Sequence, residues 1–123
     1  MKQEQVDDVI SLALDIKLDG LIVSNTSITR ENLITPLNEI NSIGAGGLSG
    51  KPITQKSTRM IGYIYKATNG QVPLIGSGGI FTGADALEKI NAGASLVQVW
   101  TGFIYEGPMI VKRISAYLAA RFK

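Results

Sequence analysis

The stretch of the chain that most constrains its fold covers residues 72–101 and has the pattern of a strand, a helix and a second strand. The apolar run at residues 72–75 is short and is followed by turn residues, as is typical of a strand buried on both faces of a sheet. A helix is predicted over residues 84–91, with a capping box of Thr82 and Asp85 at its start and Gly93 as a left-handed C-cap after it. A second strand is predicted over residues 95–100. Because a helix joins the two strands, we expect them to be parallel.

Three glycines follow the first of these strands, at Gly76, Gly78 and Gly79. Without side chains over the backbone, the amide N–H groups can close on an anion, and a side chain placed at Gly79 is expected to enter the space of that anion. In a (β/α)8 barrel, the loops after the last two strands and a short extra helix commonly bind phosphate, and residues 101–105 have the position of such a helix. The glycines therefore indicate a candidate phosphate site, although a plain strand-to-helix turn has the same pattern.

The remaining segments continue the alternation of helices and strands. Apolar periodicity predicts helices over residues 3–17 and 54–68 and a C-terminal helix with Pro108 at its first position, N1. A strand is predicted over residues 21–24. Between them, residues 26–52 have no helical or strand periodicity, so a long loop is expected there, either a functional lid or a disordered insertion. The predicted class is therefore α/β with a parallel sheet of three strands, whose outer strands have unpaired edges.

Polar residues begin where the strand at residues 21–24 ends. Ser24, Asn25 and Thr26 lie at its carboxyl end, where ligands bind in parallel α/β folds. These residue types also favour turns and helix N-caps, so their position alone leaves a purely structural role open. The amide and hydroxyl groups can form hydrogen bonds with a polar ligand, but they cannot act as a general base.

Composition excludes several classes of function. The chain has 123 residues, no cysteine and no histidine, so disulfides, thiolate nucleophiles and the usual metal ligands are missing and no metal site is expected. The formal net charge is only +2 and the basic residues are scattered, so no nucleic-acid partner is expected. No apolar run approaches the roughly 20 residues of a transmembrane helix, and the N-terminus lacks the apolar segment of a signal peptide, so the chain as given is expected to be soluble and intracellular.

Four motifs, in order and with sensible gaps, resemble those of dihydroorotate dehydrogenases. They are DGLIVSNTS at residues 19–27, GGLSGKP at residues 46–52, IGSGGI at residues 75–80 and LVQVWTGFIYEGP at residues 96–108. Several motifs together are more specific than one glycine cluster, and the second and the fourth are most similar to the quinone-linked class. The resemblance implies a single partial domain over residues 1–123, formed by about three βα units from the C-terminal part of an FMN-binding (β/α)8 barrel, or TIM barrel.

The resemblance also implies a function. Members of this family are FMN-dependent oxidoreductases that convert dihydroorotate to orotate in de novo pyrimidine (UMP) biosynthesis, and the quinone-linked class passes the electrons to a quinone. Such enzymes associate peripherally with a membrane, on its cytoplasmic side or, in eukaryotes, at the mitochondrial inner membrane. The partners implied for this chain are therefore dihydroorotate or orotate, a quinone and the remainder of the barrel.

Carried over position by position, the resemblance implies roles for eight residues. The residues implied to bind FMN are Ser24, Gly50, Gly78, Gly79, Trp100 and Thr101, and those implied to bind the substrate are Asn25 and Thr26. Gly79 would give a backbone amide to the FMN phosphate, with Trp100 and Thr101 on the same side. Trp100 stands where the family usually has tyrosine, so an aromatic surface is kept and the phenolic hydroxyl is lost.

The same resemblance implies that no catalytic residue lies in this chain. The catalytic base of the quinone-linked class, a serine, belongs to a part of the fold that precedes these residues, as do its flavin-contacting lysine and its membrane-binding helices. We therefore expect the chain alone to be inactive, and either to need the remainder of the barrel or to self-associate through its open sheet edges. Two alternatives stay open: a non-catalytic flavin- or phosphate-binding half-barrel, and a truncated product without a function of its own.

Overall fold

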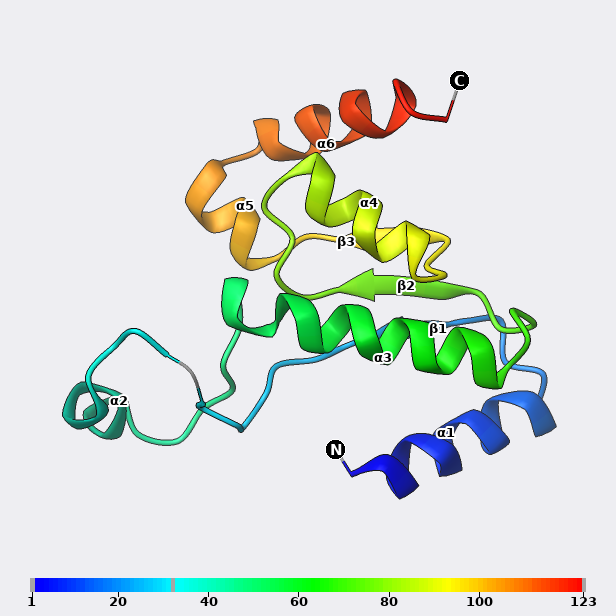
Figure 1. Cartoon of the computed structure of the whole chain (residues 1–123), viewed down its shortest axis with the longest axis horizontal. Helices are drawn as coiled ribbons and strands as arrows, with labels where there is room; N and C mark the ends of the chain where they lie inside the picture. Colours follow the sequence, from blue (N-terminus) through cyan, green and yellow to red (C-terminus); the bar gives the residue numbers. More distant parts are fainter. Residues whose placement is uncertain (1, 32, 123) are drawn as a thin grey trace.

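The computed structural model describes residues 2–31 and 33–122 of the chain, in which helices and strands alternate (Figure 1). In chain order the elements are α1 (Gln3–Asp15), β1 (Leu21–Val23), α2 (Leu37–Ile43), the 3-10 helix η1 (Lys51–Ile53), α3 (Thr54–Ala67), β2 (Leu74–Ser77), α4 (Gly83–Asn91), β3 (Leu96–Gln98), α5 (Thr101–Glu106) and α6 (Met109–Ala119). The three strands form one parallel sheet in the order β1-β2-β3. The predicted α/β class is thus confirmed, and within the described residues β1 and β3 each have one unpaired edge.

The sheet has one covered and one uncovered face. Val23 and Leu74 belong to the core beneath the helices and are only 4% and 0% exposed. Ile75 is paired with Ile22 on one side and with Leu96 on the other, so these three residues form a row on the opposite face. In that row Ile22 is 61% and Leu96 is 62% exposed. The strands are apolar on both faces, as predicted, but in this chain only one face is buried, because the described helices pack against that face alone.

Two apolar clusters hold the helices on the covered face. The first packs α1 and α3 against β1 and β2, with Val6, Ile10 and Ile61 among its buried residues. The second packs α4 and α6 beside β3, with Ala86 and Ile110 among its buried residues. In Figure 1, α1 accordingly lies along α3, and α6 lies along α4. The burial of these apolar side chains fixes where each strand ends relative to its neighbours.

Local signals predicted the ends of several helices. The N–H of Asp85 donates to Oγ1 of Thr82 at 3.1 Å, and the N–H of Thr82 donates to Oδ2 of Asp85 at 2.9 Å, which is a capping box at the start of α4. Gly93 follows the C-cap of α4 with a φ angle of +119°. The expected short helix after the last strand is present as α5. Pro108 is the N-cap residue of α6, so its prediction at N1 was wrong by one position.

The segment predicted as a long loop contains a short helix, α2, that the sequence pattern did not predict. α2 has seven residues and only Ile40 among them is buried, so too few apolar positions repeat to produce a period. Backbone hydrogen bonds between Ser27 and Leu48, at 3.0 Å and 2.7 Å, join the two ends of the segment. The guanidinium of Arg30 donates to three backbone carbonyl groups within it. The segment is therefore a closed loop with its own hydrogen bonds, which favours a functional loop over a disordered insertion.

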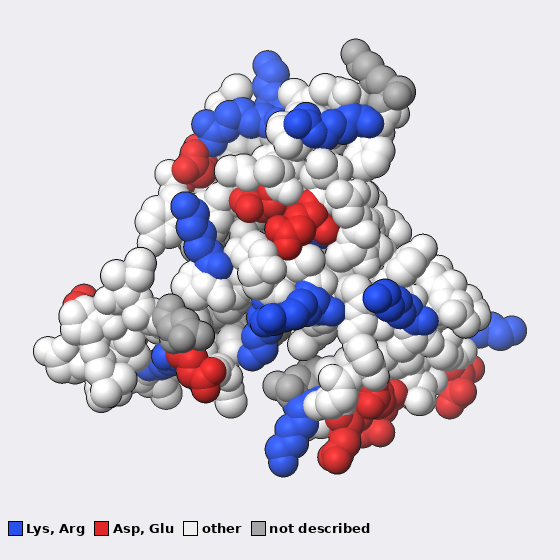
Figure 2. Space-filling view, viewed as in Figure 1, with Lys and Arg blue, Asp and Glu red and all other residues white. Residues whose placement is uncertain are grey.

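Charged side chains of both signs are mixed on the surface. On the face shown in Figure 2, lysine and arginine side chains lie among those of aspartate and glutamate. This mixture agrees with the small formal net charge of +2. Among the helices of the described residues, none combines the length and the apolar character that crossing a membrane requires.

Candidate functional site

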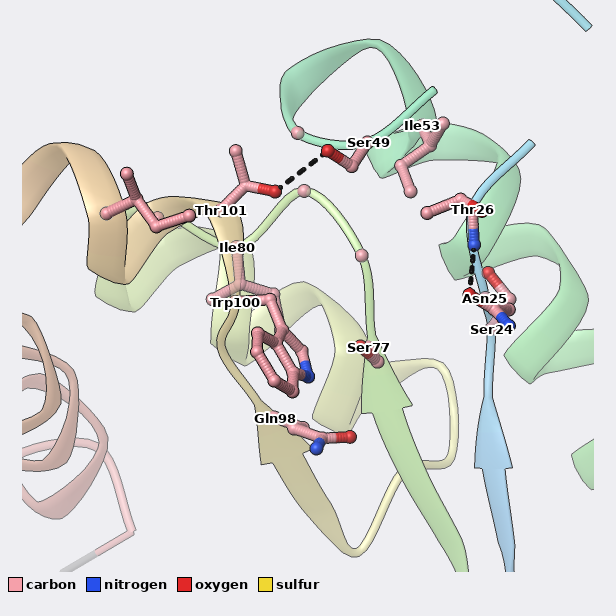
Figure 3. A pocket seen from close by; sticks show the side chains of 15 residues that line it. Ser24, Asn25, Thr26, Ser49, Ile53, Ser77, Ile80, Gln98, Trp100 and Thr101 are labelled. Carbon is pink, nitrogen blue, oxygen red and sulfur yellow. Dashed lines mark hydrogen bonds between the residues drawn. The ribbon is translucent and has the colours of Figure 1, made fainter. Parts of the chain in front are cut away.

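A pocket of about 320 Å³ lies where the carboxyl ends of the three strands meet (Figure 3). Its walls come from the segment after β1, the glycine turn after β2 (residues 78–80), the start of α5 after β3, and the end of the long loop of residues 26–52. All eight residues that the resemblance implies to bind FMN or substrate line this pocket. Four segments that are far apart in the sequence therefore meet at the end of a parallel sheet where ligands bind in α/β folds.

A row of polar residues crosses the sheet at the base of the pocket. The N–H of Ser24 donates to the carbonyl oxygen of Ser77 at 3.1 Å, and Ser77 is paired with Gln98 in the register of β2 and β3. Figure 3 shows these three residues at the ends of their strands. Sequence reasoning missed Ser77 and Gln98 as lining residues. Each is the last residue of its strand in the structure, but the strands predicted from the sequence ended at residues 75 and 100, so neither stood at a predicted strand end.

Backbone N–H groups at two places in the pocket have no acceptor among the described residues. Those of Gly78, Gly79 and Ile80 belong to the glycine turn, and those of Thr101 and Gly102 belong to the start of α5. Gly79, Ile80 and Gly102 are buried residues. Because buried backbone N–H groups are nearly always paired, this set of donors indicates a ligand with several acceptor atoms, such as a phosphate.

The glycine turn packs directly on the start of α3. Gly78 and Gly79 have φ angles of +107° and +71°, a region that favours glycine. A Cβ atom added at Gly79 would overlap Oγ1 of Thr54, the first residue of α3, and would lie 2.7 Å from its Cα. The expectation that a side chain here would enter the anion space is therefore wrong, because the Cβ direction is towards α3. Glycine is needed for the close approach to this helix and for the backbone conformation.

The end of the long loop closes the pocket against the start of α5. The Oγ1 of Thr101 donates to Oγ of Ser49 at 3.0 Å (Figure 3). Gly50 is buried and has a φ angle of +80°, and a Cβ atom added there would lie 3.3 Å from Cγ2 of Thr101. The backbone angle and the tight packing both favour glycine at this position. Two of the motifs recognised in the sequence thus contact each other directly.

Asn25 and Thr26 lie across the pocket from Thr101 and are exposed (Figure 3). The N–H of Thr26 donates to Oδ1 of Asn25 at 2.7 Å, which orients the side-chain amide. Nδ2 of Asn25 has no acceptor among the described residues, so it can donate to a carboxylate or a carbonyl group of a ligand. A Cβ atom at Gly47 would overlap the side chain of Thr26, so the long loop packs directly on this residue.

Trp100 gives the pocket a flat apolar surface beside Gln98 (Figure 3). Its side chain is 70% exposed, so the indole ring is available to a planar ligand. No ionisable side chain lines the pocket within the described part of the chain. The arrangement can therefore hold an anion by backbone amides and a ring system by an aromatic surface, whereas proton transfer needs a group from elsewhere.

Comparison with known proteins identifies relatives of nearly the whole chain. The family model described as dihydroorotate dehydrogenase matches residues 1–122. The quinone-type dihydroorotate dehydrogenase of Synechococcus sp. (strain JA-3-3Ab) is 50% identical over 123 residues, which cover 94% of this chain and 32% of that protein. That of Gloeobacter violaceus is 50% identical over 120 residues, covering 98% of this chain and 33% of that protein. The chain thus spans about a third of the length of these curated relatives.

Solved structures of the same kind share the fold. The crystal structure of dihydroorotate dehydrogenase (DHODH) from Eimeria tenella in complex with ferulenol superimposes on this chain with a TM-score of 0.86 at 44% identity. The match covers 96% of this chain and 30% of that one. The ligand-free form of the same protein has a TM-score of 0.87 and covers 96% and 32% of the two chains. The three βα units are therefore part of a TIM barrel, as predicted.

Proposed function

Because this chain belongs to the dihydroorotate dehydrogenase family, we propose that residues 1–123 are the C-terminal third of a quinone-linked dihydroorotate dehydrogenase and form one partial domain of it. The complete enzyme oxidises dihydroorotate to orotate in pyrimidine biosynthesis and passes the electrons to a quinone. In this proposal the chain binds FMN and orients the substrate, whereas the catalytic base comes from the upstream part of the barrel.

The observation that carries this proposal is the set of unpaired backbone amides at the carboxyl end of the sheet. The N–H groups of Gly78, Gly79 and Ile80 lie on one wall of the pocket, and those of Thr101 and Gly102 lie on another. A phosphate group offers several acceptor oxygens and can pair with many donors at once. The residues present therefore fit the phosphate of FMN.

The other cofactor residues have roles that follow from their chemistry. The hydroxyl of Ser24 and the backbone of Gly50 would contact FMN, and neither residue carries a large side chain that would fill the pocket. Trp100 would offer its indole ring as an apolar surface for the cofactor. When bound, FMN supplies the hydride-accepting chemistry, which no side chain of this pocket can supply.

Substrate binding is assigned to the side of the pocket formed by Asn25 and Thr26. The amide of Asn25 is already oriented by the N–H of Thr26, so less conformational freedom is lost when Nδ2 donates to the carboxylate or a ring carbonyl of dihydroorotate. The hydroxyl of Thr26 can donate or accept within the same set. These residues bind and orient the substrate, and they do not remove its proton.

The remainder of the barrel is the partner proposed for the uncovered face of the sheet. On this face Ile22 of β1 and Leu96 of β3 are more than half exposed, although both are large apolar residues that flank Ile75 of the central strand. A closed barrel fills its interior with such side chains from all of its strands. Association with a membrane and access to the quinone are assigned to the upstream part of the complete enzyme.

The test uses a chimera in which residues 1–123 replace the segment that they match in the Synechococcus relative. We expect the purified chimera to contain stoichiometric FMN by its flavin absorbance and to oxidise dihydroorotate with a quinone analogue as acceptor. The 123-residue chain alone, assayed in parallel with added FMN, is expected to show no turnover. A folded chimera that neither retains nor binds FMN would contradict the proposal. Tight FMN binding by the chain alone, without turnover, would favour the non-catalytic half-barrel.

A further inference from the structure

Two hydroxyl groups of α3 form hydrogen bonds with carbonyl groups at the glycine turn. Oγ of Ser57 donates to the carbonyl oxygen of Ser77 at 2.5 Å, and Oγ1 of Thr54 donates to the carbonyl oxygen of Gly79 at 2.9 Å. In a planar trans peptide the C=O and the following N–H point in opposite directions. The two contacts therefore turn the N–H groups of Gly78 and Ile80 away from α3, and both residues line the pocket. The amide of Gly79 lies between these two anchored peptides.

A buried lysine fixes the residue that provides one of these anchors. Lys89 of α4 is 0% exposed, and its Nζ donates to the carbonyl oxygen of Thr54 and to Oγ1 of Thr58, both at 2.6 Å. The hydroxyl of Thr58 donates in turn to the carbonyl oxygen of Thr54 at 3.1 Å. Thr54 is thus held by Lys89 through its backbone and holds Gly79 through its side chain.

The position of Lys89 needs an explanation, because lysine is rarely buried without a carboxylate partner. The ion pair within the described residues joins Arg113 to Glu106 on the surface and does not involve Lys89. Burial lowers the pKa of Lys89 below its usual value of 10.5, while the charges of Glu88 and Asp85 act in the opposite direction. The ammonium group therefore occupies an environment that disfavours its charge, and it donates two hydrogen bonds to residues in the first two turns of α3.

We propose that Lys89 and Thr54 are positioning residues that hold the amides of the glycine turn in the geometry required for a phosphate. The proposal rests on the proposed FMN phosphate site and adds to it two residues that do not line the pocket. Lys89 fixes the carbonyl group of Thr54, Thr54 fixes the carbonyl group of Gly79, and the N–H groups of the turn face the ligand. A role in core packing alone would stabilise the fold without favouring ligands that carry a phosphate.

Comparison of FMN with riboflavin separates these two roles, because the two ligands share the ring system and the ribityl chain and differ in the phosphate. The dissociation constants of both ligands are measured by fluorescence titration of the flavin-free chimera. For Lys89→Met, which keeps an apolar side chain of similar length, we expect the dissociation constant of FMN to rise about 10-fold to 100-fold, as the loss of a charged hydrogen bond implies. That of riboflavin should stay within about twofold.

Variants of Thr54 test the same contact from its other end. Thr54→Val removes the hydroxyl at nearly constant volume and should weaken the binding of FMN relative to that of riboflavin. Thr54→Ser keeps the hydroxyl and should keep the preference for FMN over riboflavin. Lys66→Met is the matched control, because Lys66 is an exposed residue in the last turn of α3 and its replacement makes the same change in charge. It should leave both dissociation constants unchanged.

The outcomes distinguish the inference from the function on which it rests. Parallel weakening of FMN and riboflavin, or unchanged FMN affinity, in Lys89→Met and Thr54→Val would overturn the positioning role. If Lys89→Met does not fold by circular dichroism, the pair Thr54→Val and Thr54→Ser decides the question. An unmodified chimera that binds no FMN would instead overturn the proposed function itself.

Discussion

Replacement of Gly79 by alanine is expected to destabilise the chimera and to release its FMN. The added Cβ would overlap Oγ1 of Thr54 and lie 2.7 Å from its Cα, which is a backbone atom and cannot rotate away. Overpacking of this kind costs ~1–3 kcal/mol, and the φ angle of +71° costs a residue other than glycine a further ~1–2 kcal/mol. We therefore expect the free energy of unfolding to fall by about 2–5 kcal/mol.

Two control substitutions separate these costs. Gly44 has a φ angle of +79° and a ψ angle of −158°, a region almost restricted to glycine, but no described atom lies within 4 Å of an added Cβ. Gly44→Ala should therefore cost only the ~1–3 kcal/mol of the backbone conformation. Gly46 has neither a left-handed φ nor such a neighbour, so Gly46→Ala should change stability little. Urea unfolding gives the free energies, and flavin absorbance gives the FMN content. If Gly79→Ala costs no more than Gly44→Ala, the turn does not pack on α3 in the way described.

Three further predictions follow from the site, the open sheet and the buried lysine. Asn25→Ala in the chimera should weaken the binding of orotate by ~1–3 kcal/mol while FMN is retained. An unchanged orotate affinity in a titration would contradict the substrate assignment. The 123-residue chain alone should have a mass above that of a monomer by light scattering, since Ile22 and Leu96 are 61% and 62% exposed. Lysine at both positions should lower that mass, and an unchanged mass would contradict association through this face. Because the pKa of Lys89 is lowered on folding from its usual 10.5, the folded state loses this proton first as pH rises. The free energy of unfolding of the unmodified protein should therefore increase as pH rises from the lowered pKa to 10.5, whereas that of Lys89→Met should lack this increase. Urea unfolding at several pH values measures both, and equal pH profiles would contradict the prediction.

Much of the fold was readable because its signals are local. The capping box of Thr82 and Asp85 acts over three residues, and the glycine at position 93 acts at a single backbone angle. The alternation of apolar strands and amphipathic helices predicted the parallel sheet in the same way. The short helix α2 was missed because a single buried residue, Ile40, carries no period. The eight site residues were predicted by resemblance to a family, and they meet in one pocket.

Sequence alone therefore determined the class, the order of the three strands and of the helices that cover them, and the candidate binding residues of this protein. Tertiary structure decided how those residues are supported, because contacts between segments far apart in the chain leave no local pattern. Ser77 and Gln98 became part of the site through the register of the sheet. The contact of Thr54 with Gly79, and that of Lys89 with Thr54, depend on how α3 and α4 pack against β2. The same packing leaves Ile22 and Leu96 uncovered, because the helices of this chain reach only one face of its sheet.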